Sequence, residues 1–219
     1  MTFDDAMTAL QGLDGAALDL LVRDWRADVA VEERIELAAQ LWDTGETRPR
    51  IAAAKLLTQA RIAEDDEVWA LILDWAGEPQ ALAEGAVAQA VAKAGERRLA
   101  ADPSRLVELA DLIDHPALEP RRTALAMTLP FAKMAFPKDE DLAIRETVLD
   151  WAALLWATRA TRPAAEAWVA ALARHDAARA DLWRSAREGE RDAAREASQP
   201  KPRPDAGEAP DPDAPGAED

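Results

Sequence analysis

Two adjacent arginines, Arg121 and Arg122, are the residues of this chain best suited by type and position to bind an anion. They precede the apolar run 123–127, which is expected to be helical. Paired guanidinium groups beside a helix N-terminus can converge with unpaired backbone N–H groups on one phosphate. The whole chain carries a formal net charge of -16, so this cationic pair is a local exception. We therefore expect Arg121 and Arg122 to bind phosphate.

Other basic residues occur near expected helix starts and joints, where a stack of helices would present them along one edge. They are Arg48, Arg50, Lys55, Arg97, Arg98, Arg159 and Arg162. This pattern predicts a track for phosphate groups. The alternative is an ordinary set of solvated arginines paired with the many acids. The overall charge opposes a polyanion at long range, but screening over about 8 Å at physiological salt allows a local patch to act.

Several kinds of chemistry are excluded or not indicated. The chain has no cysteine, which excludes disulfides, thiolate metal sites and a thiol nucleophile. His115 and His175 are far apart, and each lies next to an aspartate, which is typical of turns rather than of metal pairs. We expect no cofactor and no metal. No stretch approaches the roughly 18 apolar residues of a membrane span, so a soluble, cytoplasmic protein without a membrane partner is expected.

Hydrophobic periodicity indicates helices throughout the folded part. Apolar residues recur at three- and four-residue spacing, as in Ile144, Val148, Trp151 and Leu155. No segment alternates apolar and polar residues, so no strand is predicted. Helix ends are expected at Gly45, Gly77 and Gly95, and a helix start at Asp102-Pro103. These signals predict roughly eleven short helices.

An internal repeat indicates how the helices are arranged. Residues 38–49 and 152–163 share eight identities in twelve positions, including Leu-Trp and Thr-Arg-Pro, at an offset of 152 − 38 = 114 residues. Because 114 is three times 38, and paired-helix repeats of the HEAT class run about 40 residues, the offset predicts stacked helical hairpins. The fold class is thus all-α, a HEAT-like right-handed solenoid (an α-α superhelix), with a concave face as the usual binding surface. The alternative is chance similarity of two helix joints in an alanine-rich chain.

The composition changes at Pro200. Residues 200–219 contain six prolines, six acids and two bases, and no large apolar side chain. We expect one helical domain over residues 1–199 and a disordered, Pro- and acid-rich tail over 200–219. The tail contributes -4, so the remaining -12 belongs to residues 1–199.

Several segments resemble the DNA alkylation repair family, which comprises HEAT-like DNA glycosylases that release alkylated purines. The similarity spreads over roughly residues 17–198. The segments that carry it are 50–57 (Arg-Ile-Ala-Ala-Ala-Lys-Leu-Leu), 94–99 (Ala-Gly-Glu-Arg-Arg-Leu), 121–125 followed by Leu129-Pro130, 174–176 and 195–197. No single segment is diagnostic of the family. The resemblance depends on the order and spacing of the segments.

The resemblance implies hydrolysis of the N-glycosidic bond to a purine methylated at N3 or N7. Such an enzyme uses a carboxylate and aromatic faces to stabilise an oxocarbenium-like sugar and a cationic base, and an arginine to hold the neighbouring phosphate. It also implies duplex DNA, possibly alkylated, as the partner. The nucleic-acid-binding residues expected on this basis are Arg121, Arg122, Arg50, Lys55, Arg97, Arg98 and Trp168.

The catalytic groups of the family do not carry over. With the 94–98 segment fixing the register, the family's Trp-x-x-x-Asp pattern falls on Leu82 and Ala86. Glu84 is expected to point away from the groove that Ala86 faces, about 200° around a continuous helix, and Gln89 shares that face without a charge. A gap in the alignment between Trp75 and Gly95 would shift the register and make Asp74 and Trp75 the candidates. The alternative interpretation is that Trp75 is a buried core ring and Asp74 an exposed acid on the same helix. No catalytic residue is therefore assigned.

Other aromatic and acidic positions also depart from the family. Glu119 replaces a tryptophan before the arginine pair, and Ala167 occupies the expected ring position next to Trp168. These changes predict a DNA-binding protein with weakened or lost excision, and we expect it to be a monomer. The alternative is a non-catalytic HEAT-repeat scaffold that binds a basic protein.

Overall fold

The computed structural model describes residues 1–58 and 65–197, and every regular element in them is helical. The N-terminal elements are α1 (Phe3–Ala9), α2 (Gly15–Asp28), α3 (Val31–Asp43), α4 (Thr47–Leu56), α5 (Asp65–Ala76), α6 (Pro79–Leu82) and α7 (Gly85–Ala101). The later elements are the 3₁₀ helix η1 (Pro103–Leu109), α8 (Ala110–Ile113), α9 (Leu118–Met127), α10 (Leu129–Ala132), α11 (Asp139–Trp156), α12 (Arg162–Ala173) and α13 (Ala177–Ala197). The all-α prediction is confirmed, and the described helices outnumber the eleven expected because several are single turns.

The chain divides into two compact units, Met1–Trp183 and Arg184–Asp219. In the second unit, residues 184–197 are the end of α13 and carry a local ion pair between Arg187 and Glu190 at 2.7 Å. The prediction of one domain over residues 1–199 stays a prediction. The predicted disordered tail, 200–219, lies outside the described residues.

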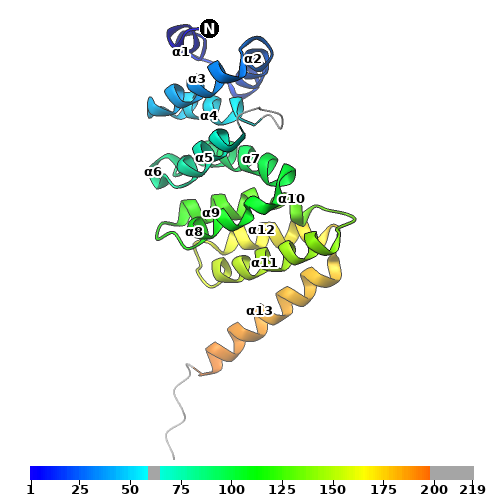
Figure 1. Ribbon diagram of the computed structural model, residues 1–219. Coiled ribbons are helices and arrows are strands. Elements are labelled where there is room, and N and C mark those ends of the chain that lie inside the picture. Colours follow the sequence, from blue (N-terminus) through cyan, green and yellow to red (C-terminus); the bar gives the residue numbers. More distant parts are fainter. Residues whose placement is uncertain (59–64, 198–219) are drawn as a thin grey trace, which may run out of the picture. The chain divides into compact units, whose positions relative to one another are not determined.

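Within the first unit, consecutive helices form pairs that stack on one another (Figure 1). The pairs are α3 with α4, α5 with α7, α8 with α9, and α11 with α12, while α1 packs on α3 and α2 on α4. The helices α2, α4, α7, α9 and α12 make one layer, in which each contacts the next. This is the packing of an α-helical solenoid, and the right-handed HEAT-like superhelix stays a prediction.

Side-chain hydrogen bonds between neighbouring parts of the stack recur at the predicted period. Trp42 Nε1 donates to Glu78 at 2.7 Å, 36 residues away, and Trp69 Nε1 donates to Glu108 at 3.0 Å, 39 residues away. Arg48 donates to the carbonyl of Leu10 across 38 residues at 3.4 Å. Because the offset between the repeats is three times 38, it corresponds to the three steps from the α3–α4 pair to the α11–α12 pair.

Both copies of the repeat form a helix joint held by an arginine on a tryptophan. In the second copy the Arg162 guanidinium lies 5.1 Å from the Trp156 ring centre, and its Nε donates to the Trp156 carbonyl at 3.1 Å. At the first copy, Arg50, the residue that follows the repeat, makes the same two contacts with Trp42, at 5.1 and 3.2 Å. Arg48, which matches Arg162 in sequence, does not take this role.

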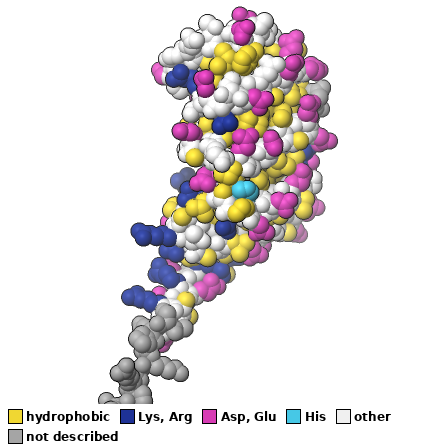
Figure 2. Space-filling model, turned by 90° about the vertical axis from the view of Figure 1, so that its left-hand side faces the viewer, with side chains coloured by type: hydrophobic (Ala, Val, Ile, Leu, Met, Phe, Trp, Pro, Cys, Tyr) yellow, Lys and Arg dark blue, Asp and Glu magenta, His cyan; other side chains and the backbone are white. Residues whose placement is uncertain are grey.

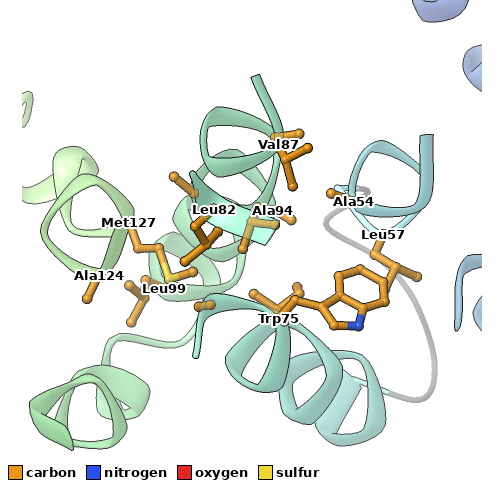
Figure 3. Close-up of a cluster of buried hydrophobic side chains, with 14 of the residues drawn as sticks. Ala54, Leu57, Trp75, Leu82, Val87, Ala94, Leu99, Ala124 and Met127 are labelled. Atoms are coloured by element: carbon orange, nitrogen blue, oxygen red, sulfur yellow. The ribbon is translucent and has the colours of Figure 1, made fainter. Parts of the chain in front are cut away.

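Two of the three glycine helix ends are confirmed, and one is wrong. Gly45 lies between α3 and α4 with φ of +74°, and Gly77 follows α5. Gly95, however, lies inside α7. A Cβ atom at Gly95 would come within 2.5 Å of Met127 Sδ, so glycine is needed here because α7 packs closely on α9 and not because a helix ends. Figure 3 shows Met127 beside α7 among the buried side chains.

On the face that Figure 2 draws, the carboxylates are spread over the surface rather than gathered in one patch. The core holds most of the tryptophans: Trp25, Trp42, Trp69, Trp75, Trp168 and Trp183 are all buried. Trp75 stacks on Trp42 at 4.5 Å between ring centres, which agrees with the interpretation of Trp75 as a core residue.

Candidate functional site

A hollow of about 640 Å³ lies over α2, α4 and α7. Its floor is apolar, with Leu18 and Val22 from α2, Ile51 from α4 and Ala90 from α7. The charged side chains around it are Asp19, Arg26, Lys55 and Lys93. The helices place them together because residues three, four and seven positions apart share one face of each helix.

A second hollow of about 310 Å³ lies over α7, α9 and α10. Its charged side chains are Lys93, Glu96 and Arg122. Gln89 and Lys93 line both hollows, so the two adjoin along α7. We call the combined surface the α7 groove.

The α7 groove carries more cations than carboxylates. Among the described residues, four cations line it, Arg26, Lys55, Lys93 and Arg122, against Asp19 and Glu96, which gives 4 − 2 = +2. Lys55 pairs with Asp19, and Lys93 pairs with Glu96 at 2.6 Å. Both carboxylates are therefore engaged by lysines.

The two groove arginines donate only to neutral acceptors among the described residues. Arg26 donates to the carbonyl of Lys55 at 3.5 Å, and Arg122 donates to the carbonyl of Ala160. Neither forms an ion pair with a described carboxylate. Their positive charges therefore remain available to an anion in the groove.

A smaller hollow of about 300 Å³ on other helices has the opposite charge. It lies between α3 and α5, where Glu32, Glu36 and Glu67 surround Ile35, Ala39 and Leu71. We call it the acidic hollow. The excess of cations in the α7 groove is thus local, because a hollow elsewhere in the same unit is lined by three glutamates.

The structure places the predicted arginine pair differently from expectation. Helix α9 begins at Leu118, so Arg121 and Arg122 are its fourth and fifth residues rather than the residues before its first turn. The unpaired amides at the helix start lie near Glu119 instead. Arg122 lines the groove, whereas Arg121 is half-buried, and its Nε has no hydrogen-bond acceptor among the described residues.

The other predicted basic residues divide into two groups. Lys55 lines the groove, and Arg97 is exposed one turn after Lys93 on α7. Arg50 and Arg98 have structural contacts instead. Arg50 packs on Trp42, and Arg98 is 2% exposed.

Arg98 is the buried member of an ion-pair cluster in which Asp65 of α5 bridges Arg98 of α7 and Arg105 of η1. It pairs with Asp65 and donates to the carbonyl of Leu57 at 3.2 Å. Asp65 also pairs with Arg105 at 2.7 Å. Burial lowers the pKa of Arg98, and the Asp65 charge opposes that shift. In this conformation Arg98 presents no charge to a ligand at the surface.

No aromatic side chain of the described residues lines either hollow of the groove. Trp168 is 1% exposed, and its Nε1 has no hydrogen-bond acceptor among the described residues. Its ring is therefore not available as a stacking surface in this conformation. The same holds for Trp75, which points into the core (Figure 3).

The positions that match the family's Trp-x-x-x-Asp pattern fall on two helices. Leu82 ends α6 and is buried, whereas Ala86 lies in the first turn of α7 and lines the groove. The estimate of 200° for Glu84 assumed one continuous helix, which the break between α6 and α7 makes invalid. The expectation itself is met, because Glu84 lines neither hollow and Gln89 lines both.

Sequence reasoning did not single out Arg26 and Lys93 as binding residues. A usable signal was present, because Asp19, Val22 and Arg26 share one face of α2, and Gln89 and Lys93 are one turn apart on α7. His115 was correctly interpreted as a turn residue, since its Nδ1 accepts from the Ala117 amide at 3.0 Å. Within the described ranges, no group of three or more His, Cys, Asp or Glu side chains is placed to hold a metal ion, and no helix is long and apolar enough to cross a membrane.

Fold and site together define an all-α helical stack with a groove suited to an anionic ligand. Residues 5–199 match the family model described as DNA alkylation repair enzyme. The chain belongs to this family, which confirms the resemblance seen in the sequence. A comparison with curated proteins and one with solved structures gave no match.

Proposed function

We propose that the protein binds duplex DNA, including alkylated DNA, through the α7 groove, and that its glycosylase chemistry is weak or absent. The observation that carries this proposal is the excess of cations in the groove of a chain whose net charge is -16. Phosphate contacts by Lys and Arg supply most of the affinity of proteins for DNA. Membership of a DNA repair family makes DNA the favoured polyanion.

The phosphate contacts are assigned to Arg122, Lys55 and Lys93, with Arg26, Arg97 and Arg121 beside them. Arg122 is the strongest candidate, because its guanidinium has no carboxylate partner among the described residues. Lys55 and Lys93 each keep a carboxylate partner, Asp19 and Glu96 respectively, while they contact phosphate. That partner offsets part of each lysine's charge, so Arg122 is expected to contribute more than either lysine.

Weak excision follows from the same surface. The two groove carboxylates, Asp19 and Glu96, are paired with lysines, so neither offers an uncompensated negative charge to an oxocarbenium-like sugar. In the part of the chain that the structure describes, no aromatic ring lines the hollows to stabilise a cationic base. Loss of one preorganised electrostatic partner commonly costs about 10² to 10³ in rate.

Binding is tested with a duplex that contains an abasic-site mimic, over a range of salt concentrations. The variant Lys93→Glu with Arg122→Glu should bind much more weakly and reduce the salt slope, by about 0.9 per lost phosphate contact. Arg23→Glu with Arg174→Glu is the matched control, because both residues are exposed and line neither hollow. Undetectable binding at low salt, or equal loss in both variants, contradicts the proposal. Arg121→Glu with Arg122→Glu tests the adjacent pair in the same way.

Chemistry is tested by the release of 7-methylguanine from methylated DNA. We expect a rate close to that without protein. Rapid release that is abolished by Asp19→Asn or Glu96→Gln would show that a groove carboxylate is catalytic and that excision is retained.

The acidic hollow supports a second candidate function, a scaffold for a basic protein. Its three glutamates surround an apolar floor, which is complementary to an amphipathic segment with lysines or arginines. The variant Glu32→Lys with Glu36→Lys separates the two functions. It should abolish binding of such a partner while leaving the Arg122-dependent binding of DNA in place.

A further inference from the structure

The short link between α10 and α11 exposes a phenylalanine. Phe136 is 96% exposed, in the segment 133–138. A single exposed apolar residue is common on protein surfaces and carries no conclusion by itself. The way in which the link is held, and its position beside the α7 groove, make this residue informative.

A buried arginine anchors the link. Arg145 of α11 is 2% exposed, and it donates to the carbonyls of Phe131 and Met134 at 3.0 and 2.9 Å. Asp176 lies 3.6 Å from the same guanidinium. These contacts hold the backbone at Phe131 and at Met134, two residues before Phe136.

The next residue restricts the link further. Pro137 disfavours the helical conformation for the residue that precedes it, so the backbone of Phe136 has fewer states than that of an ordinary loop residue. A preorganised side chain loses less entropy when it binds. The structure therefore presents an aromatic ring to solvent on a restrained support.

The link lies at the edge of the α7 groove. Lys133, its first residue, has its Nζ 3.9 Å from an oxygen of Glu96, which lines the second hollow. Leu129 of α10 lines the same hollow, and Figure 1 shows the link leaving α10 beside α7 and α9. Lys138, at the other end, is exposed. An aromatic ring between two lysines at the edge of a cationic groove matches the composition of surfaces that stack on nucleic-acid bases.

We propose that Phe136 stacks on a base face exposed at a gap in the base stack of bound duplex DNA, as at an abasic site. This inference rests on the proposed function, because it requires DNA in the groove. Apolar side chains inserted at base steps are an established way in which proteins bind deformed DNA, and the insertion is cheapest where stacking is already lost. Lys133 and Lys138 then lie near the flanking phosphates.

The acids that follow the link oppose phosphate at its far end. Asp139 and Glu140 are exposed in the first turn of α11, whereas Asp141 accepts a hydrogen bond from the Lys138 amide at 2.9 Å. Lys133 is therefore expected to contribute more to DNA binding than Lys138. The ring, rather than the charge of the link, is expected to supply the selectivity for a gap.

The experiment compares equilibrium binding of an intact duplex with that of the same duplex carrying one abasic-site mimic. Phe136→Ala should weaken binding of the abasic duplex about fivefold or more, and of the intact duplex less than about twofold, since stacking acts where a base face is open. Phe136→Trp should restore the preference. Val107→Ala, at a residue that is 73% exposed on η1, is the matched control and should leave both affinities unchanged.

Three outcomes overturn the proposal: equal affinity of Phe136→Ala and wild type for both duplexes, equal weakening of both duplexes, or the same effect from Val107→Ala. If Lys93→Glu with Arg122→Glu still weakens binding in those cases, the DNA-binding groove stands and only the stacking role fails. If that double variant has no effect either, the proposed function itself fails. Because Phe136 is almost fully exposed, its substitutions leave the core intact.

Discussion

Two arginines in consecutive positions show how far residue type alone predicts a role in this protein. Both Arg97 and Arg98 were expected to bind nucleic acid, yet Arg97 is exposed on α7 while Arg98 is buried against Asp65. Neighbours on a helix point about 100° apart, so one of two adjacent residues commonly faces the core. Which one does so depends on where α5 packs, and the sequence does not state that directly.

Gly95 is the residue whose size most limits the packing of α7 on α9. Gly95→Ala should destabilise the fold by about 1 to 3 kcal/mol, because the added methyl group overlaps Met127, which is fully buried. Urea unfolding measures the loss. In a Met127→Ala background the sign should reverse, since alanine is favoured over glycine inside a helix by about 1 kcal/mol. Gly189→Ala, with nothing within 4 Å of the new methyl, is the control and should be stabilising or neutral.

Glu146 gives a pH-dependent contribution with a defined sign. Its hydrogen bonds and ion pair with Arg179 lower the pKa of this carboxyl below the usual value of 4.5. A carboxyl with a lowered pKa stabilises the fold above its unfolded pKa, and that contribution is lost as pH falls through the folded pKa. Wild type should therefore exceed Arg179→Gln in stability above about pH 4.5, by no more than about 1 kcal/mol for so exposed a pair.

Measuring both variants by thermal unfolding as a function of pH tests this assignment. The difference between them should shrink as the solution becomes more acidic than the usual carboxyl pKa. A difference that grows on acidification would mean that Arg179 acts through another contact.

At the scale of elements, the repeat predicted the spacing of the helix pairs but not which arginine packs on the tryptophan at each joint. The offset of 114 residues corresponds to three steps between pairs, and the Leu-Trp and Thr-Arg-Pro sequences do mark helix joints. The arginine that packs on the tryptophan, however, is Arg162 within the second copy but Arg50, just after the repeat, at the first. Helix α4 begins at Thr47, whereas α12 begins one repeat position later, at Arg162. A sequence alignment alone does not reveal this shift.

Arg50 and Arg162, which pack on a tryptophan at the two helix joints, should contribute more to stability than Arg48. This holds although Arg48 is the residue that matches Arg162 in the repeat. Arg162→Lys keeps the charge but loses the donation from Nε to Trp156 and the planar stacking, so a loss of about 1 to 2 kcal/mol is expected. Arg50→Lys should have a similar effect. Arg48→Lys should cost less, because Arg48 is exposed and its one contact, to Leu10, is long at 3.4 Å. Comparable losses in all three variants would show that the ring contact contributes little.

At the scale of the whole molecule, the cations of the α7 groove must attract DNA against the repulsion from the net negative charge of the rest of the chain. The α7 groove has a formal charge of +2, whereas the chain carries -16. Composition alone would have argued against a polyanionic ligand, and only the pairing of helices shows which cations gather. Arg122 was anticipated because it belongs to an arginine pair beside an expected helix start, and both Lys55 and Arg122 fall in segments that resemble the family. Arg26 and Lys93 were not, because no such segment contains them.

Substitutions in the acidic hollow allow the long-range repulsion between the chain and DNA to be measured. Replacing Glu32, Glu36 and Glu67 by glutamine changes the net charge from -16 to -13 without touching the groove. At low salt, where the Debye length is about 30 Å at 0.01 M, this variant should associate with DNA several times faster than wild type. At 0.15 M, where charges are screened beyond about 8 Å, the two rates should converge. Stopped-flow association rates at both salt concentrations test this, and an acceleration that persists at the higher salt would mean that the α3–α5 face itself contacts the DNA.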